Sequence, residues 1–306
     1  MTTFIIRRII QTIPVLLGVT VLVFSLMHLT PGNPAVIMAG ESAPEATVRA
    51  IEARLGLNDP LYVQYWNFLS SAVQLDFGNS IRDNIPVANH IQARFLITLE
   101  LAIYSTIFAI VMGVFTGIVS SVRRYSIEDV TIMVIALFGL SMPNFWLGLM
   151  LIQWFSINLG WFSPTGWGSM SQNVLPVIAL GTGGAAIIAR MTRSSMLDVI
   201  SQDYIRTARA KGVQERVVIF RHALKNAMIP VVTVIGLQFG YLLAGAVLTE
   251  SVFAINGLGR LIIDSILQRD FPVVQGAVLV IAVSFVVVNL LVDISYKMLN
   301  KRVDLN

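Results

Sequence analysis

The segment DYIRTARAKGVQERVVIFRHALKNAMIPVV, residues 203–232, holds the side chains whose types and spacing most directly suggest a function. Its arginines and lysines stand between two of the most apolar stretches of the chain. Each such charge costs about 2.5–3.5 kcal/mol at the centre of a bilayer, so the segment must lie outside the hydrocarbon. Two roles fit it. The charges bind anionic lipid, as basic segments beside a membrane commonly do, or the segment docks on a soluble partner protein.

The sequence offers little else that could support catalysis or metal binding. It has three histidines, in different regions: His28, His90 and His222. This dispersal disfavours a shared metal site. The glycines at 181, 183 and 184 have neither the lysine nor the following Ser/Thr of a phosphate-binding loop at the required spacing. Cysteine is absent, and the carboxylates Glu128 and Asp129 fall in a short predicted loop where solvation explains them. We therefore expect no catalytic residue, metal or cofactor in this chain.

The elements that must position the basic segment are membrane helices. The chain of 306 residues is 56% hydrophobic and only 12% charged, whereas soluble domains average about 25% charged residues. A bilayer core needs about 20 apolar residues in a helix. Six segments qualify, at residues 9–29, 99–122, 130–159, 174–189, 228–249 and 273–298. We predict an all-α, polytopic membrane protein with six spans.

Three spans carry particular features. The fourth is short and glycine-rich, so we expect it to pack against neighbouring helices rather than lipid. Pro143 interrupts the third span, and we expect a kink there. The first span has the alternative reading of a signal peptide, but its apolar run exceeds the roughly 7–15 residues of a signal peptide, which favours a retained helix.

Basic residues are distributed unevenly between the two sides of this topology. Six fall on one side: Arg49, Arg54, Arg82, Arg94, Arg260 and Arg269. Fifteen fall on the other: Arg7, Arg8, Arg123, Arg124, Arg190, Arg193, Arg206, Arg209, Lys211, Arg216, Arg221, Lys225, Lys297, Lys301 and Arg302. Because the richer side is normally cytoplasmic, both termini are predicted to be cytoplasmic.

Residues 30–98 are predicted to form a small external helical insertion. A helix with Ser42 as its cap, Pro44 in its first turn and Gly56 as its stop is followed by a second helix in LYVQYWNFLSSAV. A third helix begins near Pro86 and leads into the second span. The insertion is either a lid on the membrane helices or a docking surface for an external partner.

The inner loop, residues 190–228, is predicted to contain two helices. Residues 203–211 form the first, Gly212 ends it, and residues 214–226 form the second. The second helix is expected to share one apolar face among its residues Val217, Phe220, Leu224 and Ala227. Pro230 marks the start of the fifth span. Such a loop would be a stiff lever on that span.

Polar side chains inside the predicted spans are the candidates for a transport pathway. They are Asn144, Gln153, Thr233 and Gln238. Intramembrane amides and hydroxyls either hold helices together or line a path. Asn144 and Gln238 are the first choices, because they flank a proline and a pair of glycines.

The inner loop resembles that of permease subunits of bacterial ABC importers. Their motif reads Glu-Ala-Ala, three residues, Gly and later Leu-Pro. RTARAKG places Gly212 and Ala208 on it, and MIP ends it at Pro230. Arg206 and Thr207 replace its glutamate and first alanine, so an ion pair of that glutamate cannot be carried over. DYIRTARAKG is similar to the dipeptide, oligopeptide and nickel branch, and so are HLTPGNPA, LGLNDPLYVQYW, DFGNSI, MTRSSMLDV, NAMIPVVTVIGLQFG, LTESVFAINGLGRL and RDFPVVQG.

The resemblance implies a function and a set of partners. The chain would form half of a translocation pathway in the bacterial inner membrane, with a homologous second permease, two ABC ATPases that use ATP and magnesium, and an extracytoplasmic binding protein. No nucleic acid is expected. The resemblance puts the ATPase-docking loop at Arg206, Thr207, Ala208, Arg209, Ala210, Lys211, Gly212, Val213, Gln214, Glu215 and Pro230. Dipeptide-type permeases are the closest match.

Two other functions stay open at this stage. An ion-coupled secondary transporter would need ionisable groups within the membrane, and the candidates Glu100, Glu250 and Asp293 lie near span ends. A membrane scaffold or receptor is the other alternative. The domains expected are 1–29 (the first span), 30–98 (the insertion) and 99–306 (the permease core).

Overall fold

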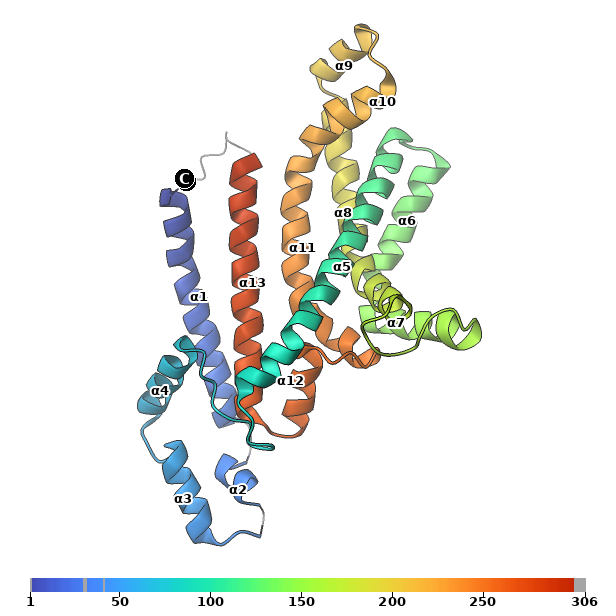
Figure 1. The fold of residues 1–306 in the computed structure, drawn as a ribbon. Coiled ribbons are helices and arrows are strands. Elements are labelled where there is room, and N and C mark those ends of the chain that lie inside the picture. The colour runs from blue at the N-terminus through green and yellow to red at the C-terminus, as the bar shows by residue number, and fades with distance from the viewer. Residues whose placement is uncertain (1, 30–31, 41, 300–306) are drawn as a thin grey trace. The chain divides into compact units, whose positions relative to one another are not determined.

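The computed structural model describes residues 2–29, 32–40 and 42–299, and these residues form helices joined by short loops (Figure 1). The predicted all-α class is confirmed, because the only β-type pairing within the described residues is an isolated bridge between Asn79 and Pro86. The predicted inner residues Lys301 and Arg302 lie outside the described part of the chain. The chain divides into two compact units, residues 1–98 with 256–286 and residues 99–255 with 287–306.

The first unit is built on two long apolar helices. These are α1 (Thr2–Leu29) and α13 (Phe271–Leu299), whose C-terminal part belongs to the second unit. Three short helices follow α1, namely α2 (Pro34–Ala39), α3 (Glu45–Leu55) and α4 (Leu61–Val73). The insertion helices were thus predicted correctly except for α2. Gly56 ends α3 in the left-handed conformation, as predicted, but the N-cap is Pro44 and no Ser42 cap is present.

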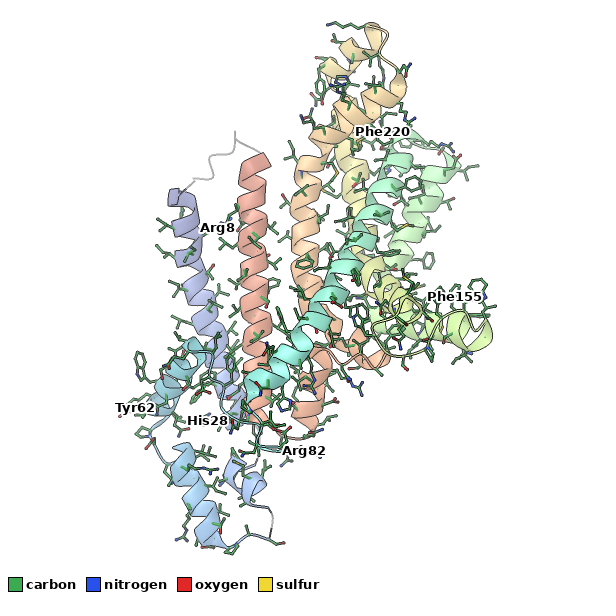
Figure 2. All side chains as sticks on the ribbon, viewed as in Figure 1. Arg8, His28, Tyr62, Arg82, Phe155 and Phe220 are labelled. Atoms are coloured by element: carbon green, nitrogen blue, oxygen red, sulfur yellow. The ribbon has the colours of Figure 1, made fainter. Side chains whose placement is uncertain are left out.

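Helix α4 packs against α1 through aromatic side chains. Tyr65 contacts the ring of Phe24 edge-on at 5.4 Å between centroids, and its hydroxyl lies 2.9 Å from that of Thr20. Tyr62 projects away from this contact (Figure 2) and is 75% exposed. One face of α4 therefore holds the insertion on α1 while the other is open.

A further short helix, α12 (Leu258–Leu267), was not predicted. Its buried face joins the start of α5 and α13 in one apolar cluster that includes Val87, Ile91 and Leu258. The backbone N–H of Leu258 donates to the hydroxyl of Thr98 at 2.8 Å, which gives one free N–H of the helix start a partner. Just before α13, the buried Asp270 accepts from the Ser80 hydroxyl at 2.5 Å.

The second unit contains the remaining long helices. They are α5 (Val87–Val122), which starts in the first unit, α6 (Ile127–Ser141), α7 (Asn144–Leu151) with the π-helix η1 (Ile152–Asn158), α8 (Met170–Ile200) and α11 (Leu224–Val252). As predicted, the helix that starts after Pro86 runs without interruption into the second span. Helix α8 is 31 residues long, whereas the sequence suggested a short span.

Small residues let α5 and α8 approach closely. Gly113 and Gly117, one turn apart on α5, face the backbone carbonyls of Ala185 and Ala189 on α8, and a Cβ at either glycine would lie within 2.7 Å of those oxygens. In the other direction, a Cβ at Gly181 would meet the carbonyl oxygen of Ser105 at 2.7 Å. The predicted packing of the glycine-rich span against other helices is confirmed.

The third predicted span is broken rather than kinked. Helices α6 and α7 meet at Met142 and Pro143 with a bend of 105°. Proline lacks the N–H that would continue the α6 ladder, and the residue before it is held in extended conformation, so the helix stops and a new one begins. Five described helices are long and apolar enough to cross a bilayer, or six when the bent pair counts as one span.

Candidate functional site

The predicted loop of residues 190–228 contains a short helix that ends at a glycine in the left-handed conformation. Helix α9 (Asp203–Ala210) is followed by Gly212 with φ 75°. The N–H of Gly212 donates to the carbonyl of Arg209 at 2.9 Å, and the N–H of Val213 donates to that of Ala208 at 3.3 Å. These two bonds make a Schellman motif, which satisfies carbonyls that the helix end leaves open. The turn predicted at Gly212 is therefore present, and its geometry requires a positive φ.

One face of α9 is held by an apolar cluster. Ile205 is fully buried and packs with Met196 of α8 and with Val218 and Ala223 beyond the turn. Tyr204 also anchors the helix, since its hydroxyl accepts from the Asn226 amide at 2.8 Å. The opposite face is exposed along residues that include Arg206, Thr207, Ala210 and Lys211. Helix α9 thus presents a polar, basic face on a firm apolar base.

An ion pair closes the turn from the other side. The guanidinium of Arg209 donates to both carboxylate oxygens of Glu215, at 3.0 Å from Nε and 2.6 Å from Nη2. This hydrogen bonding raises the pKa of Arg209 above its already high ordinary value, so the group is charged at any physiological pH. A two-point contact of this kind fixes orientation as well as distance. It links the end of α9 to the helix that follows Gln214.

The second loop helix and the fifth span are continuous. The helix α10 (Glu215–Val217), the π-helix η2 (Val218–Ala223) and α11 follow one another without a gap (Figure 1). Pro230 lies inside α11, so it does not separate the second loop helix from the fifth span, and its place at the start of the span stays a prediction. The loop and the span are one rod, with α9 at its end.

The π-helix also changes the predicted apolar face. Sequence periodicity grouped Val217, Phe220 and Leu224 with Ala227. The buried residues are Val218, Ile219, Ala223 and Ala227, and Leu224 is partly buried against them. Phe220 is 53% exposed (Figure 2). A π-helix holds more residues per turn than an α-helix, so the 3.6-residue periodicity behind the prediction does not hold across Val218–Ala223.

A cavity lies beside the break between α6 and α7. Its volume is about 340 Å³. It is lined by Leu140, Ser141, Met142, Pro143, Asn144, Leu180, Gly183, Gly184, Ile187, Gln238, Tyr241 and Leu242. These residues come from α6, α7, α8 and α11, and none carries a charge. The polar groups that face the cavity are amides and hydroxyls.

The two amides of the cavity stand over the two glycines of α8. A Cβ at Gly183 would lie 3.7 Å from the Asn144 side-chain oxygen, and one at Gly184 would lie 3.8 Å from that of Gln238. At both glycines the nearest atoms are side-chain atoms and not backbone, so the missing side chains leave space beside the two amides. The structure brings Asn144 and Gln238 together at one cavity, as their positions beside proline and glycine suggested.

The other two pathway candidates lie elsewhere. Gln153 is exposed on η1, where its amide donates to Asn158 at 3.2 Å. Thr233 lies on α11, and its buried hydroxyl has no hydrogen-bond partner among the described residues. Neither residue lines the cavity.

Sequence reasoning missed an ion pair between the start of α6 and the C-terminal part of α8, in which the carboxylate is buried and the guanidinium is partly exposed. Asp129 is 3% exposed and accepts two hydrogen bonds from the guanidinium of Arg193, each at 2.7 Å. The prediction that solvation explains Asp129 is wrong. The signal available in the sequence was the capping pattern of Ser126 before an apolar run, which places Asp129 in the first helical turn and not in a loop.

Comparison with known proteins adds the family. Residues 109–305 match the family described as binding-protein-dependent transport system inner membrane component, and residues 1–102 match its N-terminal counterpart. The chain is a permease subunit of this ABC importer family. It is 46% identical over 303 residues to the glutathione transport system permease protein GsiC of Escherichia coli K12 and of Shigella dysenteriae, with 99% of both chains covered. These relatives place the permease in the peptide and nickel branch.

Solved structures agree on the fold of the permease. The inward-facing MetNI methionine ABC transporter matches with a TM-score of 0.60 at 18% identity, covering 69% of this chain and 96% of that one. An amino acid ABC transporter solved with histidines matches with a TM-score of 0.51 at 18% identity, covering 70% and 94%. The family description, an inner membrane component, together with the apolar helices confirms the predicted multi-pass inner-membrane permease.

Proposed function

We propose that this permease forms half of the pathway of an ATP-driven importer for dipeptides and other short peptides. A homologous second permease would complete the pathway. An extracytoplasmic binding protein would deliver the cargo, and two ABC ATPases would bind ATP and magnesium. The support for the peptide class is twofold: the relatives named above carry glutathione, itself a short peptide, and the cavity at the helix break is lined by amides and hydroxyls.

The uncharged lining is the observation that carries this proposal. Peptide groups exchange hydrogen bonds readily with the Asn144 and Gln238 amides, which can both donate and accept. A fixed charge in the cavity would attract peptides of one sign and repel the other, by a factor that is large in a low-dielectric site. A neutral polar path passes peptides of either charge. It also differs from the path of an ion-coupled transporter, which needs an ionisable group.

The loop supplies the proposed contact with the ATPases. The exposed face of α9, with Arg206, Thr207, Ala210 and Lys211, would dock in a groove of an ATPase subunit. Helix α9 rests on α8 and α11 through the cluster around Ile205. Movement of the ATPases would therefore reach both walls of the cavity.

A change of charge in the cavity tests the proposal. The complete importer with Gln238→Glu, reconstituted with ATP, is expected to take up an acidic dipeptide about tenfold less well relative to a neutral one, because about 1.4 kcal/mol of repulsion gives that factor. Uptake of a basic dipeptide should be spared. The measurement is uptake of labelled neutral, acidic and basic dipeptides by the same vesicles.

Gln153→Glu is the matched control, since it introduces the same charge on an exposed side chain outside the cavity. It should leave the ratio of acidic to neutral uptake unchanged. Equal ratios for Gln238→Glu and the parent would exclude the cavity from the path. A parent importer that shows no ATP-dependent dipeptide uptake would reject the peptide assignment itself.

A further inference from the structure

In the ion pair between Asp129 and Arg193, both oxygens of the Asp129 carboxylate accept hydrogen bonds. Arg193 donates from Nε to one oxygen and from Nη2 to the other, both at 2.7 Å. The Ser120 hydroxyl of α5 donates to the first oxygen, and the Tyr125 backbone N–H donates to the second at 3.0 Å. Three segments of the second unit thus converge on one carboxylate.

Stability alone is a weak reason for such a pair. Taking the Asp129 carboxylate and most of the Arg193 side chain, which is 25% exposed, out of water costs solvation free energy. Apolar residues of similar size often stabilise a protein as well as such a pair, or better. What an apolar contact does not provide is a fixed orientation, which the planar fork of arginine on a carboxylate does provide. The pair therefore fixes how α6 lies along α8 at this end.

The two helices meet again at the cavity. A Cβ at Gly139 of α6 would lie 3.0 Å from the Thr182 side chain of α8, so these two residues touch. Asp129 and Gly139 are ten residues apart on α6, and Thr182 and Arg193 are eleven apart on α8. The contacts thus pair the helices in antiparallel register over about 15 Å. Next to the second contact lie Ser141 and Gly183, which both line the cavity.

The same end of α8 carries the loop. Met196, one turn beyond Arg193, packs in the cluster that buries Ile205 of α9. A continuous set of contacts therefore runs from α9 to α8, from α8 through the ion pair to α6, and along α6 to the cavity. Helix α6 has no covalent link to the loop within this route, and of the two contacts between α6 and α8 the ion pair is the one nearer the loop.

We propose that Asp129 and Arg193 are positioning residues that make α6 and α8 move as one body when the loop is displaced. The pair transmits motion of α9 to the broken end of α6, where the cavity lies. This inference rests on the proposed function, because it requires that the loop is driven by a partner. It goes beyond that function in assigning the transmission to one side-chain contact.

The test compares Asp129→Asn with Glu128→Gln in the complete importer. Asp129→Asn removes the charge and one acceptor from the buried pair. Glu128→Gln removes the same charge one residue away, from an exposed pair with Arg123 whose side chains are 59% and 51% exposed. At equal abundance in the membrane, Asp129→Asn should raise the ATP consumed per peptide transported about tenfold, a factor within the usual range for coupling between sites. Glu128→Gln should leave that ratio unchanged.

A second variant covers the case in which Asp129→Asn does not accumulate. Arg193→Lys keeps the positive charge beside Asp129 but cannot form the two-point fork, so the protein should fold and still couple poorly. Parent-like ATP consumption per peptide in whichever of these variants accumulates would overturn the inference. A parent importer without ATP-driven uptake would instead reject the proposed function, so the two failures are distinguishable.

Discussion

Gly212 is the residue on which the geometry of the loop depends most. Its φ of 75° closes the Schellman turn, and a Cβ built on it would meet no atom within 4 Å. The cost of a side chain there is therefore conformational and not steric. For ordinary residues the left-handed conformation costs about 1–2 kcal/mol, and β-branched residues tolerate it least, whereas asparagine adopts it readily.

Gly212→Val is expected to misplace α9 while the membrane helices still insert. The ATPase subunits should then co-purify in reduced amount, and peptide-stimulated ATP hydrolysis should fall. Gly212→Asn is the matched control, since it adds a side chain of similar size that accepts the same φ. A Gly212→Val protein that is as abundant as the parent, retains its ATPases and couples ATP hydrolysis to uptake normally would contradict the hypothesis that the loop acts on the fifth span.

The element that organises the second unit is α8, and two of its glycines differ sharply in their surroundings. Gly181 lies against α5, where a Cβ would be 2.7 Å from the Ser105 carbonyl and 2.8 Å from the Phe108 ring. Gly183 faces the cavity, where the nearest atom to a Cβ is the Asn144 oxygen at 3.7 Å. One glycine permits close packing and the other leaves space.

The same substitution should therefore have opposite effects at these positions. Gly181→Ala forces two helices apart and should destabilise the protein by about 1–3 kcal/mol, the usual cost of overpacking. Gly183→Ala should leave stability unchanged or slightly higher, because alanine favours a helix by about 1 kcal/mol over glycine. It adds a methyl group to the cavity wall, so peptide uptake should fall.

Thermal unfolding of the purified protein and peptide uptake by the complete importer separate the two effects. Gly181→Ala should lower Tm, and Gly183→Ala should lower uptake at a Tm equal to or slightly above that of the parent. If Gly183→Ala transports at the parental rate, the cavity is wider than the passage needs or lies off it. If both variants lower Tm by the same amount, the different packing around Gly181 and Gly183 does not determine the effect of alanine on stability.

At this scale the sequence predicted the features that depend on composition and on the residues that end or break helices. Long apolar runs gave the spans, Gly56 and Gly212 gave two helix ends, and Pro143 marked a break. The size of that break could not be predicted, because a proline removes one hydrogen bond but the direction of the next helix is set by its packing on α8 and α11. The π-helix η2 was missed because the periodicity argument assumes a constant number of residues per turn.

The candidate site was predictable only in part. The sequence favoured Asn144 because it follows a proline and Gln238 because it lies between two glycines. Both residues line the cavity. Gln153 and Thr233 were equally polar but face elsewhere. The partner of Asp129 is 64 residues away in the chain, and no local pattern connects the two.

For the whole molecule, the bent pair α6–α7 decides how many times the chain crosses the membrane. If the pair crosses as one span, α5, the pair and α8 make three crossings between the insertion and the loop, and these lie on opposite sides. If the pair turns back, the crossings are two and both segments lie on the same side. The 2.7 Å contact between Asp129 at the start of α6 and Arg193 near the end of α8 fits three crossings, because two crossings would put these residues on opposite sides. The excess of basic residues around the loop favours its being inside.

Single cysteines in this cysteine-free chain test the topology. Asn58 follows α3, Arg124 lies between α5 and α6, and Lys211 follows α9, and all three are exposed. In intact cells an impermeant thiol reagent should label Asn58→Cys but not Lys211→Cys, and permeabilised membranes should expose both. Arg124→Cys is the internal control, because only α5 separates it from Asn58, so it should be protected whatever α6 and α7 do. Labelling of both Asn58→Cys and Lys211→Cys in intact cells, with Arg124→Cys protected, would mean that the bent pair turns back. The loop would then face away from cytoplasmic ATPases, and the proposed docking on α9 would fail with it.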